Sequence, residues 1–167
     1  HGVGTLDAII FRYAEVLLIR AEAGAELGKD PELDLTVNAL RKRVGFDVKL
    51  TSSPATDPKL VAKHPIIKGT NADLIREIRR ERRVELFGEG LRYADLMRWG
   101  CGERLVAPKA GMMLYTDVYT PEEIAVLKTE VGTYADGSLD VYGKRVTTPA
   151  IFESPKHYLF SLPLNEM

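Results

Sequence analysis

Apolar positions recur with a helical period over the first hundred residues of the chain. Between residues 5 and 28 they cover nearly the whole circumference of a helix, and Gly28 is well suited to its end. A helix that is apolar almost all round is predicted to be buried. Arg12, Glu15 and Glu22 nevertheless occur on it at spacings of three and seven residues. The sequence therefore predicts one charged stripe on a buried helix.

A second helix is predicted after a short turn. Asp30 and Pro31 offer an N-cap and a proline at the first helical position, and Gly45 offers the end. One apolar face runs between these ends, formed by Leu33, Val37, Leu40 and Val44. Two helices joined by a short turn make a hairpin, the unit of tetratricopeptide-like repeats, although no clean repeat of about 34 residues is visible.

Two further helices are predicted before residue 100. Residues 51–69 contain three prolines and are expected to be a connecting loop. A third helix is expected over residues 70–87, where Thr70 and Asp73 resemble a capping box. A fourth, short helix is expected over residues 91–99.

The pattern changes after Gly100, where glycine, proline and tyrosine become frequent and helical periodicity fades. Thr120, followed by Pro-Glu-Glu, predicts a short capped helix that ends near Lys128. The dipeptide Asp136-Gly137 lies between two short runs with apolar residues and predicts a small hairpin.

The predicted fold class is therefore mainly α. Four main helices form tetratricopeptide-like hairpins, and an irregular, loop-rich C-terminal part contains a short helix and a small hairpin. The whole chain, 1–167, is expected to be one domain. Within it we expect a helical scaffold over 5–100, a loop-rich segment over 101–156 and a terminal motif over 157–167.

Composition excludes several classes of protein. The 23 basic and 24 acidic side chains give a net charge of −1, which argues against nucleic acid as the main partner. No apolar run approaches the roughly 18 residues that a membrane helix needs. Cys101 is the single cysteine, so an internal disulfide is excluded.

The densest charge lies in the third predicted helix, with five arginines between Arg76 and Arg83. A helical wheel at about 100° per residue divides them. Arg76, Arg79, Arg80 and Arg83 are predicted to face water, whereas Arg82 joins Glu81 and Glu85 on the packing face. Buried charges are costly unless they are paired. The sequence therefore predicts an ionic network between helices, formed by Arg12, Glu15, Glu22, Arg41, Glu81, Arg82, Glu85, Arg92, Asp95 and Arg98.

A catalytic alternative exists for Glu81 and Glu85, which lie one helical turn apart. Nearby arginines would keep both carboxylates ionised, which argues against a proton-donating acid with a raised pKa. His1, His64 and His157 are far apart and lack metal-ligand spacing, and no nucleotide-binding or nucleophile motif occurs. We therefore expect no catalytic residue, no metal and no cofactor.

Four segments together resemble the C-terminal half of the SusD/RagB family, the surface glycan-binding lipoproteins of glycan-foraging Gram-negative bacteria. The most specific is "IRRERRVELFGEGLRYADLMRWG" at 78–100, in which the charged and glycine positions stand at the family's spacing. The others are "FRYAEVLLIRAEAGAELG" at 11–28, "NALRKRVGF" at 38–46 and "HYLFSLPLNEM" at 157–167.

This resemblance implies a receptor without catalytic activity at the cell-surface side of the outer membrane. Such a protein caps a SusC-like TonB-dependent transporter and captures an oligosaccharide or polysaccharide before import. The chain is expected to be a C-terminal fragment of a longer protein. The family's lipidated cysteine would lie upstream and would provide the membrane attachment.

Sugar recognition needs flat aromatic faces together with polar groups that bind hydroxyl pairs. Because binding residues tend to lie on loops of a rigid scaffold, the candidate glycan contacts are four tyrosines in the loops after Gly100. These are Tyr115, Tyr119, Tyr134 and Tyr142. Trp99 closes a helix within the ionic motif and is expected to pack instead. An alternative interpretation is a helical-repeat scaffold that binds a protein and no sugar.

Overall fold

A computed structural model describes residues 10–106, 111–115, 117–134, 137–141 and 151–159. These residues form helices and irregular segments, with isolated β-bridges in place of strands. The prediction of a mainly α fold is confirmed. The chain divides into two compact units, residues 1–101 and 102–167.

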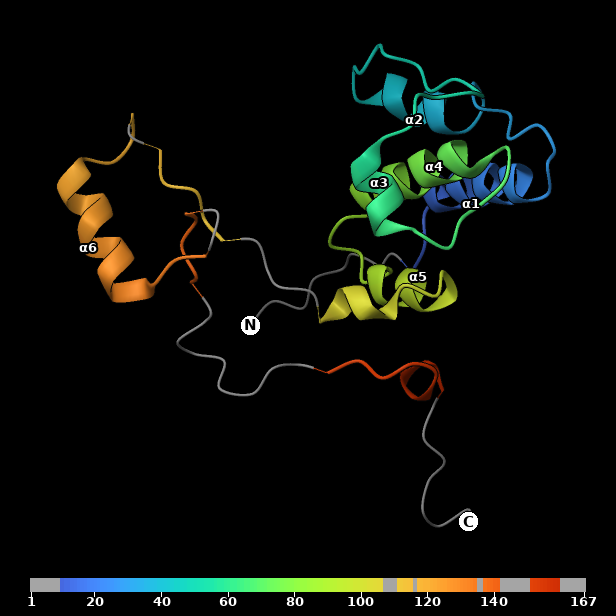
Figure 1. The fold of residues 1–167 in the computed structure, drawn as a ribbon. Helices are drawn as coiled ribbons and strands as arrows, with labels where there is room; N and C mark the ends of the chain where they lie inside the picture. Colours follow the sequence, from blue (N-terminus) through green and yellow to red (C-terminus); the bar gives the residue numbers. More distant parts are fainter. Residues whose placement is uncertain (1–9, 107–110, 116, 135–136, 142–150, 160–167) are drawn as a thin grey trace, which may run out of the picture. The chain divides into compact units, whose positions relative to one another are not determined.

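The first unit is helical and is built around α4, as Figure 1 shows. α1 packs along α4, while α2 packs against α1 and α3 against α4. The shared core is apolar and includes Leu17, Leu18 and Ala21 of α1 together with Ile75 and Ile78 of α4. The helices are α1 Tyr13–Glu26, α2 Val37–Arg43, α3 Pro58–Lys63, α4 Ala72–Glu85 and α5 Arg92–Arg98.

The turn after α1 is set by two glycines. Gly28 has a φ of 65°, a conformation that favours glycine just past a helix end. Gly24 lies against the turn itself, because a Cβ added there would come within 2.9 Å of the Cα atom of Pro31. The chain can therefore double back closely enough for α2 to pack on α1.

The predicted start of the second helix at Pro31 is wrong. Asp30 accepts a hydrogen bond of 2.8 Å from the Glu32 backbone, which forms a local turn. Glu32 then has a φ of 49°, which interrupts the helical path. The buried Thr36 hydroxyl donates to the carbonyl oxygens of Pro31 and Glu32, and α2 begins only at Val37. Since α2 has only seven residues, the tetratricopeptide-like character stays a prediction.

The loop predicted over 51–69 contains α3, which the sequence interpretation missed. Asp57 caps it by accepting a hydrogen bond of 2.8 Å from the Lys59 backbone, and Pro58 follows as the first helical residue. The predicted capping box at Thr70 is also wrong. Asp73 instead accepts a hydrogen bond of 2.5 Å from the Thr56 hydroxyl, so it ties the preceding loop to α4.

The second unit contains α6, Pro121–Val131, and two 3-10 helices at Gly102–Leu105 and Lys156–Tyr158. The prediction of a capped helix after Thr120 is confirmed, because its side chain accepts from the Glu123 backbone while the Glu123 side chain accepts from the Thr120 backbone. None of the α6 residues is buried. Their exposure means that α6 depends on its cap more than on packing.

The predicted hairpin falls partly outside the described residues, because Asp136 is not among them. On either side of it, the Tyr134 backbone donates a hydrogen bond of 2.8 Å to Ser138. Leu139 is fully buried and forms antiparallel bridges with both Met112 and Thr133. These bridges give the second unit a small centre of its own.

Candidate functional site

Glu22, in the middle of α1, is a buried carboxylate at the centre of the ionic network. One oxygen, Oε1, accepts from Arg79 Nε at 3.0 Å and from Trp99 Nε1 at 2.6 Å. The other, Oε2, accepts from Arg98 at 2.6 Å. Burial alone would raise the pKa of Glu22, but the bonds from Arg98, Arg79 and Trp99 outweigh it, so the pKa lies below its ordinary value. The carboxylate is therefore held ionised inside the unit.

A second centre lies at Arg82, which is buried on α4. Its Nε donates to both carboxylate oxygens of Asp95 at 2.9 Å, and a terminal nitrogen reaches Glu15 at 3.2 Å. Arg98 also donates to Asp95, at 3.0 Å. Arg82 thus links α1, α4 and α5 through charged hydrogen bonds.

The remaining network pairs join α4 and the loop after it to α2 and to the residue before α1. Arg41 of α2 donates to Glu81 at 2.5 Å and to the carbonyl oxygen of Val48 at 2.8 Å. Arg12, which precedes α1, reaches Glu85 at 2.5 Å and Glu89 at 2.7 Å. The pKa of Arg12 is raised chiefly by its bonds to Glu89 and Glu85, and the pKa of Glu89 is lowered chiefly by its bond to Arg12.

The prediction that Arg76 and Arg79 face water is wrong. Both are buried, because α4 packs against α1 on one side and α3 on another and has eight of its fourteen residues buried. Arg76 donates to Asp73 at 2.7 Å and to the Ile67 carbonyl oxygen at 2.6 Å. Arg79 pairs with Glu22 and, at 2.9 Å, with Glu26. Arg80 and Arg83 are exposed, as predicted.

Trp99 is buried and packs within this network, as the sequence interpretation expected. Its indole ring lies below the guanidinium carbons of Arg79 and Arg98, each 4.7 Å from the ring centroid, and of Arg92 at 5.4 Å. His64 meets the ring edge-on at 5.6 Å. Such cation–π contacts add to the hydrogen bonds at a desolvated site.

The pKa of one carboxyl group near the network is shifted in the opposite direction from the pKa of Glu22. Burial raises the pKa of Glu77 above its ordinary value, against the lowering influence of Arg80, which pairs with it at 2.5 Å. The sequence interpretation did not single out Glu77, because an acidic residue amid arginines looks well compensated. The feature that identifies Glu77 is the burial of its side chain. A helical wheel with one packing face does not predict that burial.

The candidate glycan residues lie in different surroundings. Tyr115 is exposed and Tyr119 is half-buried, and the Tyr119 backbone donates a hydrogen bond of 3.0 Å to the Tyr115 carbonyl oxygen. That bond has the spacing of a helical turn, so the two residues lie on one side of the turn that leads into α6. Tyr134 is half-buried beside Gly111, where an added Cβ would come within 2.9 Å of its ring. Tyr142 lies outside the described residues.

The first unit also has an open pocket of about 510 Å³ that the sequence interpretation did not anticipate. It lies between the turn at residues 30–35 and the segment at 49–52. Asp34 within it has a lowered pKa because Lys49 and Asn38 donate hydrogen bonds to its carboxylate. These polar groups already satisfy one another across the pocket.

Comparison with known proteins agrees with the quoted motifs. The family model of the SusD family matches residues 2–166. The chain belongs to the SusD family. SusD-like protein P38 of Formosa agariphila is 33% identical over 111 residues, which are 66% of this chain and 20% of that relative. This SusD-family chain thus spans about a fifth of the length of the curated relative that it matches. No solved structure matches it.

Two further observations concern this SusD-family chain. In the described parts of the sequence, no helix is both long and apolar enough to span a bilayer. Over the same residues, His, Cys, Asp and Glu side chains do not gather into a group that could hold a metal ion.

Proposed function

We propose that this protein is part of a non-catalytic cell-surface receptor that binds an oligosaccharide or polysaccharide for nutrient uptake. Membership of the SusD family supports the class. The observation that carries the assignment to particular residues is the pair formed by Tyr115 and Tyr119 on the turn before α6. The aromatic ring of the exposed Tyr115, next to the half-buried Tyr119, suits the C–H faces of a sugar.

The turn has the chemistry that a sugar site needs. Tyr115 and Tyr119 are one helical turn apart, and Asp117 between them is exposed. A carboxylate can accept hydrogen bonds from two neighbouring hydroxyl groups, while the rings cover the apolar sugar faces. The cap at Thr120 fixes the end of this turn at the start of α6. Tyr134 is a secondary candidate, because its ring is partly covered at Gly111.

The carboxylates of the first unit support a binding role without catalysis. Glu81 is paired with Arg41, and Glu85 is paired with Arg12 and Arg43. Both carboxylates of the Glu81 and Glu85 pair are thus engaged in ion pairs between elements of the scaffold, which supports a structural role for them.

The partner and location follow from the family. We propose that the full-length protein is anchored in the outer membrane by an N-terminal lipid, faces the cell surface, and delivers its glycan to a SusC-like TonB-dependent transporter. Nucleic acid is not proposed as a partner, because the net charge of −1 provides no cationic surplus.

The test is calorimetric titration of the full-length protein with a panel of oligosaccharides. Tyr115→Ala and Tyr119→Ala are expected to weaken binding at least about tenfold, the equivalent of 1.4 kcal/mol. Tyr93→Ala is the matched control, because Tyr93 is also exposed but lies on α5. Unchanged binding in both loop variants would contradict the proposed site. Absence of sugar binding by the full-length protein would favour the protein-binding scaffold.

A further inference from the structure

The open pocket of about 510 Å³ in the first unit has walls that are joined by hydrogen bonds. Asn38 of α2 is buried, and its side-chain amide exchanges two bonds with the Leu50 backbone, donating at 3.1 Å and accepting at 2.8 Å. The same amide nitrogen also donates to Asp34 at 3.1 Å. Asn38 therefore ties the turn at residues 30–35 to the segment at 49–52, so the pocket is formed in the absence of a ligand.

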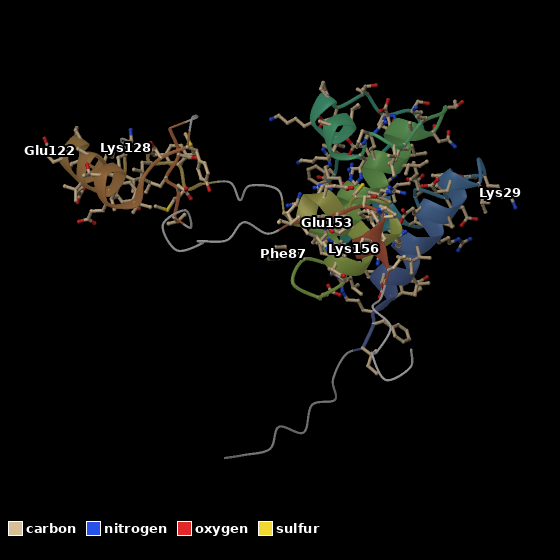
Figure 2. The ribbon with its side chains drawn as sticks, turned by 60° about the horizontal axis from the view of Figure 1, so that its bottom comes forward. Lys29, Phe87, Glu122, Lys128, Glu153 and Lys156 are labelled. Carbon is tan, nitrogen blue, oxygen red and sulfur yellow. The ribbon has the colours of Figure 1, made fainter. Side chains whose placement is uncertain are left out.

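The turn on one side of the pocket is also fixed by its own bonds. It begins after Lys29, which Figure 2 labels at the edge of the helical unit. Asp30 accepts from the Glu32 backbone, and the buried Thr36 hydroxyl donates to the carbonyl oxygens of Pro31 and Glu32. Because both walls are held in place, a ligand that enters the pocket orders little of the protein, which lowers the cost of binding.

Two charged side chains that line the pocket have bonding capacity left for a ligand. Asp34 and Lys49 pair at 3.0 Å, and their side chains are 72% and 69% exposed. Among the described residues, the bonds from Lys49 and Asn38 to this carboxylate both go to Oδ1, which leaves Oδ2 to accept from a ligand. An ammonium group has three N–H donors, so Lys49 can donate further. The pair thus offers an acceptor and a donor side by side.

This lining matches the chemistry of a sugar. Two neighbouring hydroxyl groups can donate to Asp34 and accept from Lys49 at the same time, because a hydroxyl group is both donor and acceptor. Thr51 and Ser52, which are both exposed, add hydroxyl groups to the lining. Leu35 is 65% exposed and offers apolar surface to the C–H groups of a sugar ring.

Other classes of ligand fit the lining less well. An anion would face the carboxylates of Asp30, Glu32 and Asp34, against one ammonium group among the lining residues, that of Lys49. An apolar protein surface would remove the charged pair from water, which is costly. The volume of the pocket lies in the range of about 300–1,000 Å³ that is usual for small-molecule sites. An uncharged, hydroxyl-rich ligand satisfies all of these conditions.

We propose that this pocket is a second glycan subsite, at which Asp34 and Lys49 bind neighbouring hydroxyl groups of an uncharged sugar unit. The inference rests on the proposed glycan-binding function but not on the loop tyrosines, because the lining residues all belong to the first unit. The lining contains no aromatic ring, so the subsite should bind more weakly than a site with a stacking platform.

The test removes the loop tyrosines first. The full-length protein with both Tyr115→Ala and Tyr119→Ala is the starting protein, and Lys49→Met or Asp34→Asn is added to it. Lys29→Met is the matched control, because Lys29 is an exposed lysine that adjoins the same turn but does not line the pocket. The probes are maltoheptaose, cellohexaose, xylohexaose and mannohexaose. Calorimetry and saturation transfer from protein to sugar protons measure their binding.

We expect the protein without the two loop tyrosines to keep weak binding of at least one probe. Lys49→Met and Asp34→Asn should each reduce that binding at least about fivefold, whereas Lys29→Met should leave it within about twofold. Both pocket side chains are mostly exposed, so neither change should shift the melting temperature.

Residual binding that neither pocket variant weakens would overturn the proposal. Loss of all binding on removal of the two tyrosines would also overturn it, while leaving the proposed function in place. Binding that survives the tyrosine changes and falls with Lys49→Met would support the pocket and contradict the tyrosine pair as the main site. Failure of the full-length wild type to bind any probe would overturn both the subsite and the proposed function.

Discussion

Trp99 donates a hydrogen bond of 2.6 Å from its indole nitrogen to Glu22, and so joins the end of α5 to the middle of α1 across 77 residues of sequence. The same carboxylate receives Arg79 from α4 and Arg98 from α5. One acidic side chain therefore holds three helices. Its titration should govern the acid stability of the first unit.

Glu22→Gln is expected to lower the free energy of unfolding by about 3 kcal/mol at neutral pH, the lower end of the range for breaking a buried ion pair. The folded-state pKa of Glu22 is lowered, so its contribution is present above the unfolded value of about 4.3 and is lost as pH falls through the folded value. The difference between wild type and variant should thus shrink in acid. Denaturant unfolding at a series of pH values measures it, and a constant difference down to pH 3 would contradict it.

Glu77→Gln is the matched comparison for Glu22→Gln, because the pKa of Glu77 is raised whereas that of Glu22 is lowered. The pKa of Glu77 is raised in the folded protein, so its ionised form carries a penalty above the folded pKa that disappears as pH falls through the unfolded value. The variant should be at least as stable as wild type at neutral pH, and the two should converge in acid. Denaturant unfolding over the same series of pH values measures whether the variant is more or less stable than wild type. A variant that is much less stable at pH 7 would show that the pair with Arg80 outweighs burial.

Arg82→Ala and Arg79→Ala are each expected to destabilise the protein by about 3–5 kcal/mol, because each removes a buried guanidinium that pairs with a buried carboxylate, Asp95 for Arg82 and Glu22 for Arg79. Arg83→Ala is the control on the same helix, where an exposed arginine should change stability by less than about 0.5 kcal/mol. Thermal melts of the three variants separate these values. Equal and small shifts would show that the network does not stabilise the fold.

Thr120→Ala should remove about 1 kcal/mol from the local stability of α6, since it deletes one half of the capping box. The helix buries none of its residues, so the loss should appear in amide hydrogen exchange at Glu123 and Ile124 rather than in the melting temperature of the first unit. Thr129→Ser, which keeps a hydroxyl group within α6, serves as the control. Unchanged exchange at Glu123 in the Thr120 variant would contradict the role of the cap.

Gly111→Ala should disrupt the centre of the second unit. A Cβ there would lie 2.2 Å from the Leu139 carbonyl oxygen, which is backbone and cannot move aside cheaply. The hydrogen bond of 2.9 Å from the Leu139 amide to Met112 should then exchange faster. Met113→Ala is the control, because that neighbouring side chain is exposed. Slow exchange of the Leu139 amide in the glycine variant would show that the bridge tolerates the change.

Local signals predicted some elements better than others. Asp30-Pro31 and Asp57-Pro58 look alike in sequence, and each aspartate accepts a bond from the backbone two residues on. Only Asp57-Pro58 starts a helix, because Glu32 adopts a positive φ after the first pair. That choice depends on contacts with α1, such as the close approach at Gly24, which a local pattern does not contain.

The sequence likewise predicts only part of the ionic network correctly. The helical wheel alone predicts that Arg82 lies on the packing face, and it is buried. The wheel predicts that Arg76 and Arg79 are exposed to water, because it assumes that a helix packs on one side only. Both are buried because α4 packs against more than one neighbouring helix. Their long side chains also reach partners well away from their own Cα positions. The charge pattern could identify a helix with inward charges, whereas the set of buried arginines required the arrangement of neighbouring helices.

Trp99 is the single tryptophan of the chain, and the seven tyrosines include five after Gly100. Its indole ring contacts guanidinium groups contributed by α4 and α5 and the ring of His64, all within the first unit. Its fluorescence should therefore be a built-in optical reporter of that unit alone. Opening of the network would therefore change the emission spectrum. Unfolding of the first unit can thus be followed without attaching a dye.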